Sequence, residues 1–213
     1  PESKTEFAPV MTAADDMLAP MIPMMRSDYD LATGTDATNP RQQTNAITAF
    51  IDGSGIYGSS EARAMRLRTG QGGRLVMTAD GMLPRNLPGI DMANPVNLPA
   101  AELHSAGDVR ANENPALLAM HTLWAREHNR LASQVASEQP DWTDEEIFQY
   151  ARRVVGAEIQ SITYQEFLPA LLGSRAPSLD DAAYDPSLNP GILNEFSAGL
   201  YRLGHSMIPT HIA

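Results

Sequence analysis

The stretch from Ala106 to Ala132, AGDVRANENPALLAMHTLWAREHNRLA, limits the fold most strongly, because its second half has the pattern of a long helix. Pro115 suits the first helical position, where its missing N–H would be unpaired in any case. Glu113 and Asn114 come just before it, where an acceptor or a negative charge meets the unpaired N–H groups of a helix start. Apolar and histidine side chains then recur at steps of three and four residues, which predicts one buried stripe. Its members are Leu117, Met120, His121, Trp124, His128 and Leu131.

A cation and a carboxylate lie at the start of this predicted helix. Arg110 and Glu113 are three residues apart, on a turn that begins with Gly107 and Asp108. Two interpretations are open from the residues alone. The two side chains can form a surface ion pair worth under about 1 kcal/mol, or they can belong to a chemical site. Glu113 can also act as a plain helix cap.

A second helix is predicted from Thr143. Thr143 and Glu146 have the spacing of a capping box. The helix is expected to end near Leu168–Pro169 or at Gly173, where proline and glycine interrupt the pattern. Its predicted buried stripe consists of Ile147, Tyr150, Ala151, Val154, Val155, Ile159, Ile162 and Thr163.

The remaining elements are predicted to be shorter. Residues 61–68 form a short helix, and residues 73–84 form a small hairpin around Asp80–Gly81, a favourable turn pair. Residues 191–205 form a third helix, which ends at a histidine. Residues 1–40 contain several prolines and have an irregular, loop-like pattern.

Several side chains have both a structural and a functional interpretation. Thr48, Phe50, Asp52 and Ser54 alternate along NAITAFIDGSGIYGSS, and they offer the oxygen atoms that a hard cation such as calcium prefers. By spacing alone, a glycine-rich turn explains them equally well. The last histidine, His205, follows a glycine beside an apolar face, where a buried histidine is more common than a metal ligand.

The other histidines are expected to have structural roles. His104 is predicted to lie on the surface, whereas His121 and His128 are predicted to pack within the helix interface. The sequence has no HExxH spacing, which argues against a zinc hydrolase.

Composition narrows the function classes further. The formal net charge of −11 argues against binding to nucleic acid, which would repel the chain. Cysteine is absent, which excludes disulfides and thiol chemistry within these residues. The sequence also has no apolar run as long as a membrane helix and no recognisable signal peptide.

Three stretches together resemble the animal-type haem peroxidases, the superfamily of myeloperoxidase, lactoperoxidase and peroxidasin. They are AGDVRANE followed by MHTLWAREHNRLA, then NAITAFIDGSGIYGSS, and then YRLGHSMI. The resemblance implies a mainly α fold: a multi-helix haem peroxidase domain with little strand. Residues 1–213 are then part of a single domain, with 1–40 as an irregular lead-in and 41–213 as a helical core.

The resemblance also implies a function and a set of site residues. It implies a haem-dependent peroxidase that reduces hydrogen peroxide and oxidises halide, thiocyanate or small organic donors. The implied cofactors are haem b, covalently linked to the protein, and calcium. Arg110 matches the catalytic arginine, His205 the histidine that binds haem iron, Glu113 the carboxylate that forms an ester with haem, and Arg202 a partner for a haem propionate. Thr48, Phe50, Asp52 and Ser54 match the calcium ligands.

This chain departs from the family pattern at two points. Asn114 stands where myeloperoxidase has a methionine that links to haem through a sulfonium, which favours donors that are easier to oxidise than chloride. The family's distal histidine and the asparagine that supports the proximal histidine have no counterpart in these residues, so we interpret the chain either as part of a longer domain or as a degenerate member.

Two other functions within this resemblance stay open. One alternative is a haem-dependent fatty-acid oxygenase of the same superfamily, and the other is a peroxidase-like module that serves only in interactions.

The localisation and biological role are implied by the resemblance alone. The resemblance implies a secreted protein with a role in the response to oxidative stress. Because vertebrate members carry disulfides, the absence of cysteine favours a bacterial or divergent member.

Overall fold

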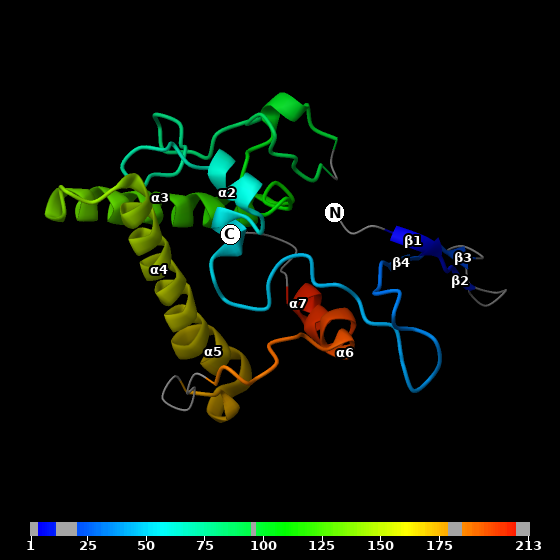
Figure 1. The fold of residues 1–213 in the computed structure, drawn as a ribbon. Helices are drawn as coiled ribbons and strands as arrows, with labels where there is room; N and C mark the ends of the chain where they lie inside the picture. The colour runs from blue at the N-terminus through cyan, green and yellow to red at the C-terminus, as the bar shows by residue number, and fades with distance from the viewer. Residues whose placement is uncertain (1–3, 12–20, 95–96, 179–184, 208–213) are drawn as a thin grey trace. The chain divides into compact units, whose positions relative to one another are not determined.

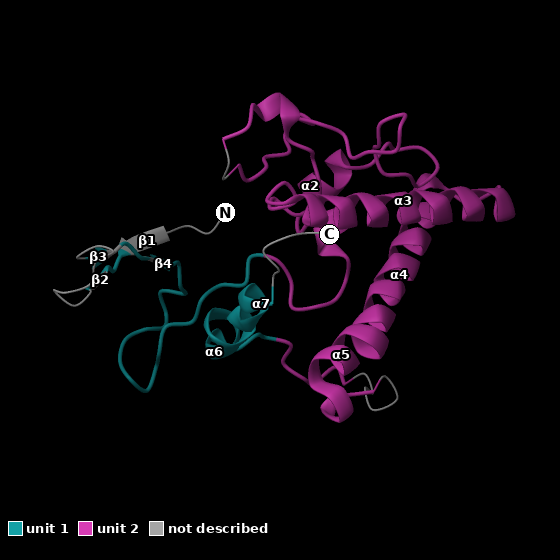
Figure 2. Ribbon diagram, turned by 180° about the vertical axis from the view of Figure 1, so that it is seen from behind, with its two compact units in different colours: residues 1–46, 191–211 teal, residues 47–190, 212–213 magenta. Residues whose placement is uncertain are grey.

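The computed structural model describes residues 4–11, 21–94, 97–178 and 185–207 and is mainly helical, as the sequence predicts (Figure 1). Contacts divide the chain into two compact units (Figure 2). Unit 1 consists of residues 1–46 and 191–211, and unit 2 of residues 47–190 and 212–213. The four short strands all belong to unit 1, and the two long helices belong to unit 2.

The lead-in of unit 1 is more regular than predicted. Strand β1 (Lys4–Phe7) pairs antiparallel with β4 (Met25–Ser27), and β2 (Val10–Met11) pairs with β3 (Met21–Ile22). The prediction of a wholly irregular segment is therefore wrong at these strands, although residues 4–11 and 21–40 contain no helix, as the prolines predict. Pairs this short are hard to recognise, because two or three residues carry almost no periodic signal.

The third predicted helix, also in unit 1, is broken. It consists of α6 (Asn194–Ala198), the 3₁₀ turn η5 (Leu200–Arg202) and α7 (Leu203–Ser206). Gly199 separates them and closes α6 by donating its N–H to the carbonyl of Glu195. Glycine favours a helix end over a helix interior, which explains the break.

Unit 2 is built on helix α3 (Pro115–Glu138), whose start is as predicted. Pro115 occupies the first turn, and the side chain of Asn114 accepts the backbone N–H of Leu117 at 2.8 Å. The predicted stripe is only partly correct, since Met120 is 49% exposed. The buried face is rotated toward small and polar side chains, which let the neighbouring segments approach closely. Its buried members are Thr122, Ala125, His128, Asn129, Leu131, Ala132 and Val135.

Helix α4 (Asp144–Ile162) packs against α3 and runs away from it (Figure 1). The predicted capping box between Thr143 and Glu146 is confirmed, with both reciprocal hydrogen bonds present. A π-helical turn, η2 (Thr163–Phe167), leads into α5 (Leu168–Leu172) and the 3₁₀ turn η3 (Gly173–Arg175), so the predicted end at Gly173 is close to the observed one.

The buried face of α4 differs from its predicted stripe. Tyr150 and Ile162 are exposed, whereas Phe148 is almost fully buried.

None of the helices in the described ranges combines the length and the hydropathy that a bilayer crossing needs.

Residues 58–114 cover α3 with loops and short elements in place of the predicted hairpin. They include α2 (Glu61–Arg66), capped by Ser60, and the 3₁₀ turn η1 (Ala100–Glu102), and α1 (Ser54–Tyr57) directly precedes them. The turn at Asp80–Gly81 forms, but no strand pair flanks it among the residues described there. The backbone of Leu75 pairs instead with the side-chain amide of Asn129, at 2.7 and 2.9 Å, so a side chain takes the place of a neighbouring strand.

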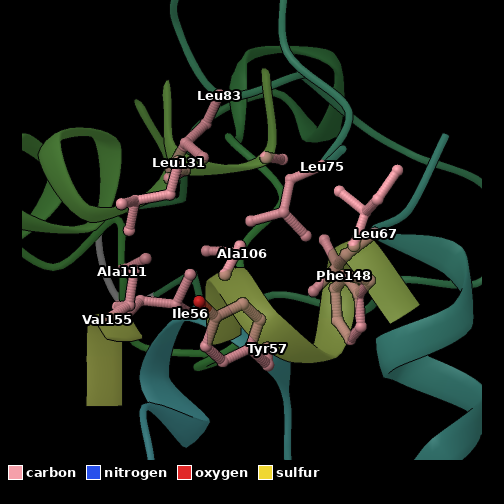
Figure 3. Packing of buried hydrophobic residues seen from close by; sticks show 14 of the residues in the cluster. Ile56, Tyr57, Leu67, Leu75, Leu83, Ala106, Ala111, Leu131, Phe148 and Val155 are labelled. Carbon is pink, nitrogen blue, oxygen red and sulfur yellow. The ribbon is translucent and has the colours of Figure 1, made fainter. Parts of the chain in front are cut away.

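One hydrophobic cluster holds unit 2 together. Tyr57 and Phe148 lie edge to face, with ring centroids 5.7 Å apart. Around them, the aliphatic side chains of the covering loops lie over the crossing of α3 and α4 (Figure 3). This cluster fixes the α1 segment, on which the candidate site is built.

Candidate functional site

The turn that carries Arg110 is seated directly on the α1 segment. The backbone N–H of Asp108 donates to the carbonyl of Gly55 at 2.9 Å. Gly107 is buried so tightly that an added Cβ would lie 2.5 Å from the carbonyl oxygen of Gly55. Arg63 holds the preceding residue, because its Nε donates to the carbonyl of Ala106 at 3.0 Å. The backbone at this turn is therefore held from two sides.

Arg110 pairs with Asp108 through a two-point contact. The Nε and Nη2 atoms of Arg110 donate to Oδ1 and Oδ2 of Asp108, at 2.9 and 2.7 Å. The side chain of Asp108 is 13% exposed and that of Arg110 is 58% exposed. Arg110 thus pairs with Asp108, and the predicted surface pair between Arg110 and Glu113 is wrong. The sequence places Asp108 in the turn, but only the folded turn reveals its pairing.

This contact has a clear electrostatic effect on the carboxylate. The hydrogen bonds from the Arg110 side chain lower the pKa of Asp108 to about 2, against the opposing effect of burial. Asp108 is therefore ionised at every pH well above 2.

Glu113 does not cap helix α3. Its side chain is exposed, and the N-cap position and its hydrogen bond belong to Asn114. The interpretation of Glu113 as a plain cap is therefore wrong.

The predicted calcium ligands lie in unit 2, in the loop that leads into α1 and at Ser54, the first residue of α1. The hydroxyl of Thr48 accepts the N–H of Phe50 at 3.1 Å, and the carboxylate of Asp52 accepts the N–H of Ser54 at 3.0 Å. The side chain of Gln160 on α4 donates to the carbonyl of Ile51 at 2.7 Å and anchors the loop.

A groove of about 560 Å³ brings three of these predicted ligands together. Thr48, Asp52 and Ser54 line it, along with Arg68 and Arg152, while Phe50 is 62% exposed. Among the residues that the structure describes, no three His, Cys, Asp or Glu side chains are grouped as a metal site would need.

His205 and Arg202, the predicted proximal residues, belong to unit 1. His205 lies on α7 and Arg202 on η5, and both side chains are exposed. Leu200 and Leu203 beside them are also exposed.

These residues fit a haem group. An accessible imidazole with exposed leucines near it in the sequence suits a ligand for the iron of a flat, apolar haem ring. Arg202 offers a cation for a carboxylate of the haem. Arg110 and Glu113, which the resemblance names as the catalytic cation and the carboxylate that forms the ester, belong to unit 2 and have exposed side chains.

The histidines of unit 2 have structural roles. The ring of His128 is fully buried between the hydroxyl of Tyr57 (2.9 Å from Nδ1) and the carbonyl of Gly73 (2.8 Å from Nε2). A carbonyl can only accept, so Nε2 carries the proton and Nδ1 accepts from Tyr57. Burial lowers the pKa of His128 to about 4.

His121 and His104 complete this group. The half-buried ring of His121 donates to the carbonyl of Leu117 at 2.8 Å. His104 is buried and donates to the carbonyl of Leu83 at 2.8 Å, so its predicted surface position is wrong. The packing roles predicted for His121 and His128 agree with these contacts.

Comparison with known proteins identifies the family of this chain. The sequence model of the family described as animal haem peroxidase matches residues 1–213. The chain is 43% identical over 171 residues to Peroxinectin A of Dictyostelium discoideum, covering 78% of this chain and 32% of that protein. It is 42% identical over 194 residues to Dual oxidase 1 of Caenorhabditis elegans, covering 88% of this chain and 13% of that protein.

Solved structures show the same relationship. Peroxidase A from Dictyostelium discoideum matches with a TM-score of 0.83 and 36% identity, over 95% of this chain and 43% of that chain. A fatty acid alpha-dioxygenase from Oryza sativa shares the fold, with a TM-score of 0.62 and 24% identity. The chain spans less than half the length of each of these proteins. Matched by the family's sequence model from end to end, this chain belongs to the animal haem peroxidase family.

Proposed function

We propose that the intact protein is a haem-dependent peroxidase that reduces hydrogen peroxide and oxidises halide, thiocyanate or small organic donors. The observation that supports this most strongly is the Arg110 guanidinium, presented to solvent from a turn that the core holds in place, in a chain of this family. The match of the family's sequence model to residues 1–213 supports treating both units as parts of one peroxidase domain.

Haem b, when bound, supplies the redox chemistry with peroxide. His205 would hold the iron through a neutral imidazole. Arg110 would stabilise the negative charge that develops as the O–O bond of peroxide breaks, since a guanidinium keeps its charge at any working pH. Arg202 would pair with a haem propionate, and Glu113 would form the ester to the haem.

The structure supports a limit on the donor. Asn114 is committed to the cap of α3, and an amide cannot form the sulfonium link that a methionine gives in myeloperoxidase. We therefore favour bromide, iodide, thiocyanate or aromatic donors over chloride. Secretion and a role in the response to oxidative stress are parts of the same proposal, and both come from the family resemblance.

The function is tested by loading the intact protein with haem and measuring peroxide-dependent oxidation of a small aromatic donor. We expect a haem absorption band and turnover, and a loss on the order of 100-fold in kcat/KM for peroxide in Arg110→Gln. Arg126→Gln is the matched control, because Arg126 is an exposed arginine of unit 2 that contacts Gly81. A full-length protein with neither band nor turnover contradicts the proposal and favours an interaction module. Oxygenated products from an unsaturated fatty acid would instead favour the oxygenase.

The same haem-loaded protein tests the ester at Glu113. After brief treatment with peroxide, extraction with acidified organic solvent is expected to leave haem on the wild-type protein and to release more of it from Glu113→Gln. Complete extraction from the wild type would contradict the ester but leave Arg110 and His205 in their proposed roles.

We also propose a calcium ion at Thr48, Phe50, Asp52 and Ser54. The support is the matching motif, the groove that three of these residues line, and the anchoring of the loop to α4. Elemental analysis of the purified intact protein is expected to find calcium, with less calcium and weaker haem retention in Asp52→Ala. Asp80→Ala, in another loop of unit 2, is the control and is expected to keep both. A protein that keeps haem and activity without any bound metal after exhaustive chelation contradicts the site.

A further inference from the structure

We propose that Asp108 is the positioning residue of the peroxide site, holding the Arg110 guanidinium in the orientation that the reaction needs. This inference rests on the proposed peroxidase function. It concerns a residue that acts through Arg110 and does not itself touch peroxide.

The contact is directional. Asp108 uses both carboxylate oxygens on the Nε–Nη2 edge of Arg110, at 2.9 and 2.7 Å, and Oδ1 also accepts the backbone N–H of Arg110 at 2.8 Å. Two parallel hydrogen bonds fix the plane of a guanidinium as well as its distance. They engage two of its five N–H donors and set the direction of the opposite edge.

Asp108 is held more firmly in the fold than the Arg110 side chain that it binds. Asp108 lies on backbone that donates to Gly55 and follows the close contact at Gly107, and its side chain is 13% exposed against 58% for Arg110. In an ordinary surface ion pair both partners are mobile and solvated, and the pair orients neither. Here a largely buried carboxylate constrains an exposed cation, which is the arrangement expected of a positioning pair.

The pair also persists under working conditions. Because the Arg110 hydrogen bonds hold the pKa of Asp108 at about 2, the carboxylate keeps its charge well below neutral pH. The orientation of Arg110 is therefore insensitive to pH across the range in which a peroxidase would turn over.

Asp108→Asn separates this role from the structural role of the turn. The asparagine keeps an oxygen for the backbone N–H of Arg110, but it places an NH₂ group against the guanidinium and loses the charge. Asp144→Asn is the matched control, since Asp144 also pairs with an arginine of unit 2, Arg68, at 2.8 Å. Asp108→Glu keeps both oxygens, displaced by one methylene.

The experiment uses the intact, haem-loaded protein and three measurements. Stopped-flow absorbance gives the second-order rate constant with hydrogen peroxide, a titration with cyanide gives its Kd for the ferric haem, and thermal unfolding gives Tm. We expect Asp108→Asn to lower the rate constant about 10- to 100-fold and to weaken cyanide binding, as substitution of a residue that orients a catalytic group does. The rate of donor oxidation and the Tm should stay close to those of Asp144→Asn, and Asp108→Glu should recover part of the loss.

A double mutant tests whether the effect passes through Arg110. If it does, adding Asp108→Asn to Arg110→Gln costs nothing further in the peroxide rate constant, whereas independent effects would multiply. Wild-type constants for peroxide and cyanide in Asp108→Asn overturn the inference and leave the peroxidase function intact. A wild-type protein that takes up no haem overturns the proposed function itself. If Asp108→Asn does not fold, Asp108→Ser carries the same comparison, since it also removes the charge and the two-point contact, and wild-type constants in that variant overturn the inference.

Discussion

Gly107→Ala is expected to destabilise the intact protein by about 3 kcal/mol, because the new methyl group has no space and its neighbours cannot move aside. A Cβ at this position would lie 2.5 Å from the carbonyl carbon of Ile56, 2.5 Å from the oxygen of Gly55 and 2.6 Å from the nitrogen of Gly58. All three are backbone atoms of α1 or of Gly58, the residue that ends it. Chemical denaturation monitored by far-UV circular dichroism measures the effect.

Gly156→Ala is the matched control for this substitution. Gly156 lies in the middle of α4, and an added Cβ there meets nothing within 4 Å. Alanine is the better helix former by about 1 kcal/mol, so this variant should be as stable as the wild type or more so. Equal stability of Gly107→Ala and the wild type would show that the turn can move away from α1, contrary to the structure.

The buried His128 is expected to make the protein lose about 3 kcal/mol of stability between neutral pH and pH 4. Burial lowers its pKa from 6.5 to about 4, so the folded protein keeps the ring neutral while the unfolded chain binds a proton below pH 6.5. Stability is therefore complete above pH 6.5 and falls as the pH drops toward 4. The loss corresponds to the difference in pKa at about 1.4 kcal/mol per unit.

Urea denaturation at a series of pH values from 7 to 4 measures this loss, and His128→Gln identifies its source. Glutamine can still donate an N–H toward the Gly73 carbonyl but does not titrate, so the variant should be less stable at pH 7 and show a flatter pH dependence. Because Asp108 has a lowered pKa of about 2, its contribution is present above pH 4 and is lost only at lower pH. Identical pH profiles for the wild type and His128→Gln would contradict the assignment.

Among the predicted site residues, the sequence could identify candidates but not their partners. The glycine, aspartate and arginine of the Gly107–Arg110 turn are all visible in the motif. Nothing in the spacing, however, distinguishes Asp108 from Glu113 as the partner of Arg110, because each is within three residues of the cation. The folded turn decides in favour of Asp108, since its backbone is held against Gly55 and directs the carboxylate toward the guanidinium.

The sequence by itself determined the features that depend on neighbours a few residues away. The start of α3 at Pro115 and the capping box at Thr143 were predictable, because a cap is a hydrogen bond between a side chain and an N–H three residues ahead. The family was also recognisable, because its motifs are continuous stretches of chain.

Only the tertiary structure decided which side chains are buried and what replaces a missing strand. His128 meets Tyr57 and Gly73 across 71 and 55 positions of the sequence, and Asn129 pairs with Leu75 across 54. Local periodicity assigned Met120 to the buried face of α3 and missed the buried polar residues Thr122 and Asn129. A buried polar group is stable only when distant segments bring it a partner, and that information lies in the packing of the chain.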